Sequence, residues 1–421
     1  MTDLMIEHAP PEWARLRLGQ VFKERKTTVS DTDYPPLSVT MNGIVPQLDT
    51  AAKTDNNDNR KLVLAGDYVI NSRSDRKGSG GISDRDGSVS VISIVLEPQG
   101  IDREFAHFLL RSRTFQEEFY RWGSGIVADL WSTRYSDMKN IRLALPPLAE
   151  QRTIAAYLDR ETGRIDALVE RLERLIALLT EKRQAVISRA VTKGLDPCAP
   201  MKDSGIDWLG EVPAHWEVGK LLRYARLESG HTPNRGTPEY WEHCVHPWVS
   251  LADVCQFRDS FLTEISETSE KISELGLANS AARLLPKGTV ILSRTASVGF
   301  ATKLGATMAT TQDFVNWVCG SELSPDYLLA TFWAMKPEFE RLKYGSTHNT
   351  IYMPDVRAFV TCVPPLAEQR AIVAKLTTDL ADLKKSLERA HQGLGLLRER
   401  RAALISAAVT GQIPLSEMEA A

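Results

Sequence analysis

Long apolar runs, paired cysteines and an excess of positive charge are all missing from this 421-residue chain. No run approaches the roughly 18 consecutive apolar residues of a membrane-spanning helix. The first residues, MTDLMIEHAPPEW, carry acids where a secretory signal carries bases. The five cysteines are odd in number and form no CxxC pair, which indicates a reducing, cytoplasmic location. The net charge of −3 excludes binding of nucleic acid by bulk positive charge, so such binding requires local patches.

The residue patterns of common catalytic sites are also missing. There is no GxxxxGK(S/T) loop for a nucleoside triphosphate, and the glycine-rich segment 78–81 is interpreted as a flexible turn. No Pro-Pro segment has the flanking residues of an amino-methyltransferase signature, and no nucleophile elbow supports a hydrolytic triad. The spacing of His243, Cys244, His246 and Cys255 fits no standard zinc finger, so we predict no metal site. The sequence therefore predicts a chain that performs no chemistry itself.

What the chain does contain is a duplication. Its length predicts two or three domains, and the heptapeptide PPLAEQR at 146–152 recurs letter for letter at 364–370. The match continues without a gap, and about 22 of 50 aligned positions are identical. Looser matches precede it, GDYVINSR at 66–73 with GTVILSR at 288–294 among them. Each half is therefore a divergent front followed by a closely matched tail.

The two tails have the sequence pattern of long helices. Prolines at 146–147 and 364–365 fit helix starts and Gly194 fits the first helix end, whereas Gly393 and Gly395 weaken the second helix. A helix of about 40 residues is roughly 60 Å long, too long for one small domain, so we expect the tails to pair as an antiparallel coiled coil. The alternative is two separate amphipathic helices, each lying on its own front. The expected seam repeats every three or four residues and comprises Ile154, Leu158, Ile165, Leu168, Leu172, Leu175, Leu179, Leu376, Leu380, Leu383, Leu387, Ala390, Leu394 and Leu397.

The fronts read as mixed α/β structure. Segments rich in β-branched residues indicate strands and segments with one apolar face indicate helices; the strands are expected at 62–72, 89–96, 289–293 and 314–318, and the helices at 103–122 and 325–344. The predicted fold class is α+β, with two mixed α/β domains, each followed by a long helix, in a pseudo-twofold repeat. The expected divisions are a first globular domain at 1–145, a helix at 146–195, a linker at 196–212, a second globular domain at 213–363, a helix at 364–413 and a tail at 414–421.

The duplication itself carries a functional hypothesis. The tails are alike, but the fronts share a plan while differing in most polar residues. Two unlike readers joined by a rigid rod describe a protein that recognises a bipartite ligand, and DNA suits this plan because successive grooves lie about 34 Å apart. Three alternatives remain: a stand-alone DNA-binding regulator, a nuclease with an unrecognised metal site, and a structural coiled-coil adaptor.

The sequence resembles a known family, the specificity subunits of type I restriction-modification systems. In both halves a Trp-containing start precedes a strand ending in Arg, a Gly-Ser loop, PPLAEQR and a long helix. The second front adds SGHTP at 229–233, PEYW at 238–241, PWVS at 247–250 with Asp253, and TTQDF at 310–314. The first front lacks the TP and YW elements, so its contacts are less well defined by the resemblance.

The resemblance implies the following functional assignment. Each front is a target recognition domain for one half of a split, asymmetric DNA site, and the paired helices fix their separation. Two methyltransferase (modification) subunits dock along the helices and methylate adenine, and restriction subunits with translocase and nuclease activity can join them. S-adenosylmethionine and ATP are then cofactors of the partner subunits, and none is expected on this chain. Outward charges at Arg160, Arg164, Glu173 and Arg174 are candidates for facing the partners.

Candidate DNA contacts are polar residues that occupy matched places in the two fronts. Base edges are read by donors and acceptors, whereas phosphates bind Lys, Arg and small hydroxyl groups. We predict direct base contacts for Gln312, His348 and Asn349, and phosphate contacts for Arg73, Lys77 and Arg294. The whole predicted set is Asn71, Arg73, Arg76, Lys77, Ser79, Ser83, Ser124, Arg134 and Tyr135 in the first front, and Arg294, Ser297, Thr310, Thr311, Gln312, Ser346, Thr347, His348, Asn349 and Tyr352 in the second.

Overall fold

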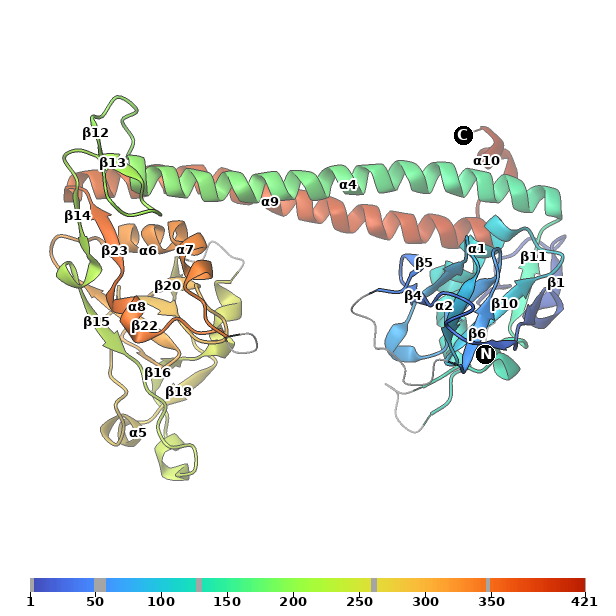
Figure 1. Cartoon of the computed structure of the whole chain (residues 1–421), viewed down its shortest axis with the longest axis horizontal. Coiled ribbons are helices and arrows are strands. Elements are labelled where there is room, and N and C mark those ends of the chain that lie inside the picture. The colour runs from blue at the N-terminus through green and yellow to red at the C-terminus, as the bar shows by residue number, and fades with distance from the viewer. Residues whose placement is uncertain (1–3, 49–57, 126–130, 259–262, 346–348, 421) are drawn as a thin grey trace. The chain divides into compact units, whose positions relative to one another are not determined.

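The computed structural model describes residues 4–48, 58–125, 131–258, 263–345 and 349–420. The chain divides into two compact units. The first unit is Met1–Glu173 with Gln392–Ala421, and the second unit is Arg174–His391. Each unit therefore holds one front, the start of the long helix that follows it, and the end of the other long helix (Figure 1). None of the described helices combines the length and the apolar character that a membrane crossing needs.

The first front is an antiparallel sheet covered by two short helices. The four-stranded sheet has the order β2-β10-β7-β8, and smaller sheets pair β1 with β11, β4 with β5, and β6 with both β3 and β9. The elements are β1 (Ala14–Arg17), β2 (Phe22–Glu24), β3 (Thr28–Val29), β4 (Leu37–Thr40), β5 (Gly43–Pro46), β6 (Arg60–Val63), β7 (Tyr68–Asn71), β8 (Gly80–Ile82), β9 (Gly87–Ser90), β10 (Ser93–Pro98), α1 (Arg103–Arg111), α2 (Arg113–Arg121), α3 (Tyr135–Met138) and β11 (Arg142–Leu145).

The second front repeats this plan with an insertion. Its main sheet has the order β15-β22-β19-β20-β17, β14 pairs with β23, and a further sheet has the order β18-β16-β21. The elements are β12 (Met201–Asp203), β13 (Glu211–Pro213), β14 (Glu217–Lys220), β15 (Ala225–Ser229), β16 (His246–Val249), β17 (Glu264–Ile265), β18 (Glu270–Ile272), α5 (Glu274–Ala278), β19 (Val290–Ser293), β20 (Ala301–Leu304), β21 (Ala309–Thr310), β22 (Phe314–Cys319), α6 (Pro325–Ala334), α7 (Lys336–Arg341), α8 (Met353–Arg357) and β23 (Val360–Val363).

The predicted strands and short helices are present, but several are interrupted by local chemistry. The expected helix at 103–122 is two helices, because Ser112 ends α1 and its side chain caps α2 by accepting the N–H of Phe115. In the second front, Pro337 lies in the first turn of α7 and marks the corresponding break. The expected strand at 62–72 is β6 and β7, separated by a turn at Gly66, whose φ is +95°. The segment at 89–96 likewise contains the turn between β9 and β10.

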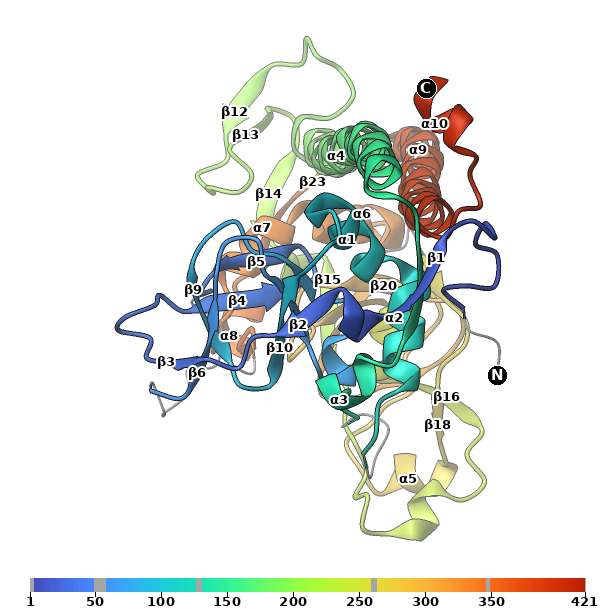
Figure 2. The same ribbon diagram turned by 90° about the vertical axis from the view of Figure 1, so that its right-hand side faces the viewer.

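The two tails form the long helices α4 (Leu148–Lys193) and α9 (Leu366–Val409), and α10 (Leu415–Ala420) follows. They pack antiparallel within the first unit: Asp166 pairs with Arg401, while Glu173, further along α4, pairs with the earlier Arg398. In the second unit the end of α4 shares a core with the start of α9. Figure 2 views both helices nearly end-on. The two glycines in α9 do not interrupt it, and an added Cβ on Gly393 would contact Leu172 at 3.4 Å.

Burial along the helices corrects the predicted seam. Leu168 and Leu175 are 46% and 44% exposed, so the seam prediction is wrong for these two residues. At 3.6 residues per turn, Val169 and Ile176 lie closer to the line through the buried Ile165, and both are half-buried. The remaining predicted residues are buried or half-buried: Ile154, Leu158, Ile165, Leu172, Leu179, Leu376, Leu380, Leu383, Leu387, Ala390, Leu394 and Leu397.

Each unit has a core made by the front together with both helices. In the first unit, Ile154 and Leu158 of α4 and Ile405 of α9 belong to the same apolar cluster as the sheet and helix α1. In the second unit, Ile187 of α4 and Ile372 of α9 have the corresponding role. The helices are therefore part of the core of each unit, and the alternative in which each helix lies on its own front alone is excluded.

Candidate nucleic-acid interface

The first unit places a group of exposed cations at the end of a central strand. β7 ends at Asn71, and the following turn carries Arg73, Arg76 and Lys77, all exposed. Arg73 forms an isolated antiparallel bridge with Ser132. The Lys77 ammonium lies 5.5 Å from the ring centroid of Tyr120 in α2, which holds the turn over that helix. We call residues 72–79 the first strand-end turn.

The second unit has the same arrangement at the end of β19. Thr295 forms an isolated bridge with Thr350, and Thr350 also bridges Tyr344. In the first unit Ser132 likewise bridges both Arg73 and Ser124. The backbone N–H of Ala296 also donates to the Asn349 carbonyl at 2.8 Å. We call residues 294–299 the second strand-end turn. In each front, these matched bridges bring the predicted contact residues just after the central strand close to those that follow the second short helix.

The polar character of the two strand-end turns differs. Thr295, Ala296, Ser297 and Val298 carry no charge, in contrast to the three cations of the first turn. Arg294 is half-buried, and its guanidinium Nε donates to the Gln312 carbonyl at 3.2 Å, so part of its hydrogen-bonding capacity is used inside the unit. Similar backbones thus present dissimilar side chains.

Five of the predicted contact residues do not lie on the surface. Asn71, Ser79, Ser83, Thr310 and Thr311 are all buried, so as the chain is folded here they are not exposed to a DNA ligand. They have structural roles because small polar side chains satisfy nearby backbone groups. The Asn71 side chain accepts the N–H of Arg73 at 3.0 Å, and the Ser83 hydroxyl donates to the Arg85 carbonyl at 2.6 Å.

The other predicted residues lie at or near the surface. Ser124, Arg134, Gln312 and Tyr352 are exposed, and Ser297 and Asn349 are half-buried. Tyr135 is half-buried and its hydroxyl donates to the Phe22 carbonyl at 2.8 Å, which ties it to the sheet. Ser346, Thr347 and His348 lie outside the described residues. These accessible residues remain predicted contacts.

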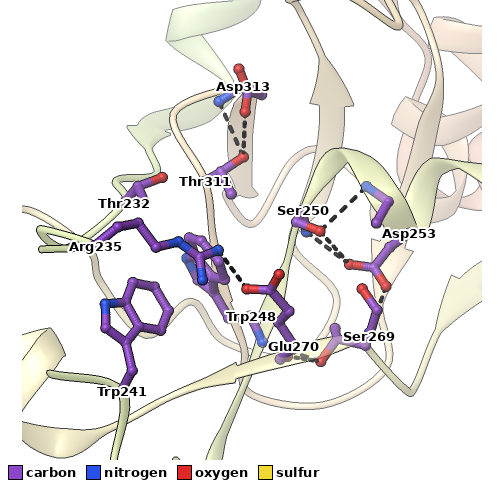
Figure 3. A network of polar contacts seen from close by, with 12 residues as sticks. Thr232, Arg235, Trp241, Trp248, Ser250, Asp253, Ser269, Glu270, Thr311 and Asp313 are labelled. Atoms are coloured by element: carbon purple, nitrogen blue, oxygen red, sulfur yellow. Dashed lines mark hydrogen bonds and ion pairs between the residues drawn. The ribbon is translucent and has the colours of Figure 1, made fainter. Parts of the chain in front are cut away.

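A second polar group in the second unit includes Thr232 and Arg235, which Figure 3 shows beside Trp241 and Trp248. The Thr232 hydroxyl donates to Gln312 Oε1 at 2.6 Å. Three residues along, the Arg235 guanidinium lies 4.0 Å from the ring centroid of Trp241 and 5.2 Å from that of Trp248. Such cation–π contacts hold an exposed arginine in one orientation. The guanidinium also donates to Glu270, at 2.5 Å.

This second group is held in place by two buried features. An added Cβ on Gly230 would lie 2.2 Å from the Thr311 carbonyl oxygen, so only glycine allows the two segments to approach. The Asp253 carboxylate is almost fully buried and accepts the N–H of Ser250 at 2.8 Å and that of Ser269 at 2.7 Å. The SGHTP, PWVS and TTQDF elements therefore form one connected structure.

Sequence reasoning missed Arg235 and Glu270 as parts of this surface. The PEYW element is one of the sequence marks of the resemblance, but the contact of its Trp241 with Arg235 is completed by the distant Trp248. A Trp near an Arg in sequence is a weak signal, because stacking requires the chain to fold back.

The structure offers no metal centre among the residues it describes. Of the four residues considered for zinc, His246 contacts Glu274 at 2.8 Å, while the Cys255 thiol donates to the Ala252 carbonyl at 3.0 Å. The two remaining thiols in the second front, Cys319 and Cys362, have their pKa raised to about 12 by burial. Neither is therefore a thiolate nucleophile at neutral pH.

Comparison with known proteins identifies a sequence family. The chain matches the family described as "Type I restriction modification DNA specificity domain" twice, over residues 10–177 and 213–390. The putative type I restriction enzyme MjaX specificity subunit of Methanocaldococcus jannaschii is 22% identical over 298 residues, which cover 69% of this chain and 65% of that protein. The MjaIX specificity subunit of the same organism is 25% identical over 181 residues, covering 42% and 41% of the two chains. The matched regions thus span less than two thirds of the lengths of these relatives.

Two solved structures share the fold. A chain from a study of complex assembly and conformational transition of the type I R-M system has a TM-score of 0.72 at 19% identity, covering 96% of this chain and 99% of that one. The HsdS subunit from Thermoanaerobacter tengcongensis has a TM-score of 0.50 at 19% identity, covering 96% and 98%. At this identity the likeness concerns the fold alone.

Proposed function

Because this chain belongs to the family of type I restriction-modification DNA specificity domains, of which it contains two copies, we propose that it reads a split, asymmetric DNA sequence. Each unit binds one half-site through its strand-end turn and the residues bridged to it. The chain supplies recognition, and adenine methylation belongs to the partner methyltransferase subunits, which bind S-adenosylmethionine. Restriction subunits, where present, use ATP.

The observation that carries this proposal is the pairing of matched backbones with unlike side chains. The bridge Arg73–Ser132 in the first unit corresponds to Thr295–Thr350 in the second. Around these bridges the first unit presents exposed cations, whereas the second presents Gln312 and Thr232. Duplicated scaffolds with different polar groups are suited to reading different base sequences.

The long helices are proposed to couple the two readers and to bind the partners. Each helix contributes to the core of both units. We therefore expect the length of the helices to set the separation of the two recognition surfaces. The outward-facing Arg164 and Arg174 are exposed and are candidate contacts for two methyltransferase subunits. Glu173 is engaged by Arg398, which makes it a contact between the helices.

The test is sequence selection from a randomised duplex pool by the chain in complex with its methyltransferase subunit. For the wild type we expect two defined half-sites separated by unspecified bases. The double variant Gln312→Ala/Asn349→Ala is expected to lose definition in one half-site and to keep the other. Asn279→Ala, which removes an exposed amide elsewhere in the second unit, is the matched control and should leave both half-sites intact.

The outcomes separate the competing functions. Equal loss of definition at both half-sites in the Gln312/Asn349 variant contradicts the two-reader proposal. Two observations together would identify a stand-alone regulator: the purified chain selects the full sequence without its partner, and the DNA of cells that contain the chain carries no corresponding methylation.

A separate test changes the length of the helices. Insertion of seven residues after Leu172 and after Gly393 lengthens both helices by about 10.5 Å. The gap should then grow by about three base pairs, because each base pair rises 3.4 Å.

A further inference from the structure

The two strand-end turns rest on matched helices in the same way. Gly78 and Gly299 each have a positive φ, +83° and +88°. An added Cβ on Gly78 would meet Gln116 of α2 at 3.2 Å, and one on Gly299 would meet Phe339 of α7 at 3.4 Å. Each turn is therefore pressed against the second helix of its front at a position that favours glycine.

Although its own residues 295–298 are uncharged, the second turn is surrounded by cations from other elements. Arg258 follows the 3-10 helix Leu251–Gln256, and Lys336 and Lys343 lie at the beginning of α7 and just after its end. These three residues and the turn line a cavity of about 170 Å³. The Arg258 guanidinium donates to the Ser297 hydroxyl at 2.8 Å and lies 5.2 Å from the Phe300 ring centroid.

The charge inside this cavity is not balanced by its lining. Among the described residues that line the cavity, Glu340 is the one acidic residue. Both of its carboxylate oxygens accept from the Lys343 ammonium at 2.6 Å. One acid against three cations leaves an excess of two positive charges around the cavity. Like charges held together are destabilising without a compensating anion. Because a water molecule takes about 30 Å³, the volume admits a phosphate group with a few waters.

We propose that this cavity binds a backbone phosphate of DNA beside the half-site read by the second unit. It occupies the place that Arg73, Arg76 and Lys77 occupy in the first unit, so both readers have a phosphate contact at the strand-end turn, built from different elements. The guanidinium fork of Arg258 and the ammonium of Lys336 donate to phosphate oxygens, and neither side chain can accept a hydrogen bond from a base. This site rests on the proposed DNA-binding function and extends it to residues that sequence reasoning did not select.

The experiment measures binding of a random-sequence duplex of about 30 base pairs, because a phosphate contact is independent of sequence. Fluorescence anisotropy is recorded for the complex of full-length chain and methyltransferase subunit between roughly 50 and 200 mM salt. For Arg258→Ala/Lys336→Ala we expect about tenfold weaker binding and a salt slope reduced by about 0.9, since the cavity accounts for one phosphate contact. Half-site selection in the randomised pool should be unchanged.

Two further variants keep the proposal falsifiable. Lys220→Ala/Lys287→Ala removes two exposed cations of the same unit outside the cavity and should leave the slope near the wild-type value. Glu340→Gln removes the cavity acid and should tighten binding severalfold at low salt. The inference is overturned if the cavity variant and the control have equal slopes, or if Glu340→Gln does not tighten binding. Failure of the wild-type complex to bind any duplex would instead overturn the proposed function.

Discussion

The side-chain amide of Gln151 joins the start of a long helix to the start of a short one. Its Oε1 accepts the backbone N–H of Asp102, the N-cap of α1, at 2.8 Å, and its Nε2 donates to the Pro146 carbonyl at 2.8 Å. Gln369 makes the corresponding contacts with the N–H of Ser324 and the Pro364 carbonyl, both at 2.8 Å. Both glutamines are buried. The repeated PPLAEQR sequence thus has a structural explanation: its glutamine docks each helix on its front.

Replacing Gln151 by Ala is expected to destabilise the first unit. The change leaves a partly buried N–H and a buried C=O without their partner, and a buried group of this kind costs about 1–3 kcal/mol. We expect a loss of about 2–4 kcal/mol in the free energy of unfolding, measured by urea denaturation. Arg152→Ala, which alters the exposed neighbouring residue, should change it by less than about 1 kcal/mol. Equal effects of the two substitutions would contradict this assignment.

The ion pair between Arg401 and Asp166 should couple the two helices measurably. It is doubly hydrogen-bonded, at 2.7 and 3.1 Å, yet both side chains are partly exposed. A double-mutant cycle with Ala at both positions is expected to give a coupling free energy of about 0.5–1 kcal/mol, since exposed pairs are screened by water. The coupling should decrease in 1 M salt, where the Debye length is about 3 Å. A cycle on the singly bonded pair Arg398–Glu173 should give a smaller value, and a larger one would reverse the ranking.

His107 should make the first unit lose stability in acid. Burial, together with the smaller effect of the positive charges of Arg111 and Arg401, lowers the pKa of His107 to about 4. Because the unfolded chain binds the proton near pH 6.5 and the folded chain only near pH 4, stability rises with pH across this window and is constant above it. At about 1.4 kcal/mol per pKa unit the full effect is roughly 3 kcal/mol, and less for a side chain that keeps some solvent contact.

The measurement is urea unfolding of wild type and His107→Gln at pH 7, 5.5 and 4.5. The difference in unfolding free energy between the two proteins should shift in favour of the variant as the pH falls through the window. A difference that is independent of pH would show that the imidazole does not titrate in this way.

Alanine substitutions at two glycines are expected to change the stability of the chain in opposite directions. Gly230→Ala places a methyl group against backbone atoms of Thr310 and Thr311, and we expect it to destabilise the second unit by more than about 2 kcal/mol. Gly395→Ala meets no atom within 4 Å in the middle of α9 and should stabilise the chain by up to about 1 kcal/mol. Limited proteolysis and thermal unfolding would report both effects. Resistance of Gly230→Ala to proteolysis at the wild-type level would exclude a close contact at this position.

The division into two fronts and two paired helices was predictable because it depends on periodicity and on the exact repeat of PPLAEQR. Element boundaries inside the fronts were less predictable from the sequence. Ser112 and Gly66 interrupt regular segments through a helix cap and a turn, and neither changes the pattern of hydrophobicity. The seam was correct except at Leu168 and Leu175, where a strict 3.5-residue period departs from the helix period.

Residue type and matched position in the two fronts suggested the candidate site, but they did not indicate which of its residues are exposed. Residue type alone does not distinguish the buried Thr310 from the exposed Gln312 two positions later. Arg258, Lys336 and Lys343 lie far from the second strand-end turn in sequence, so their gathering around it depends on the tertiary fold. Such long-range groupings have no local sequence signal.

The buried places of Ile405, Val409 and Met418 in the core of the first unit have a consequence for biosynthesis. The ribosome makes the first front early, at about 5–20 residues per second, but the residues that complete its core are made only after the second unit. The second unit, whose residues are contiguous from Arg174 to His391, is complete before them. The second unit can therefore finish folding before the first, and a chain truncated before Ile405 lacks part of the core of the first unit.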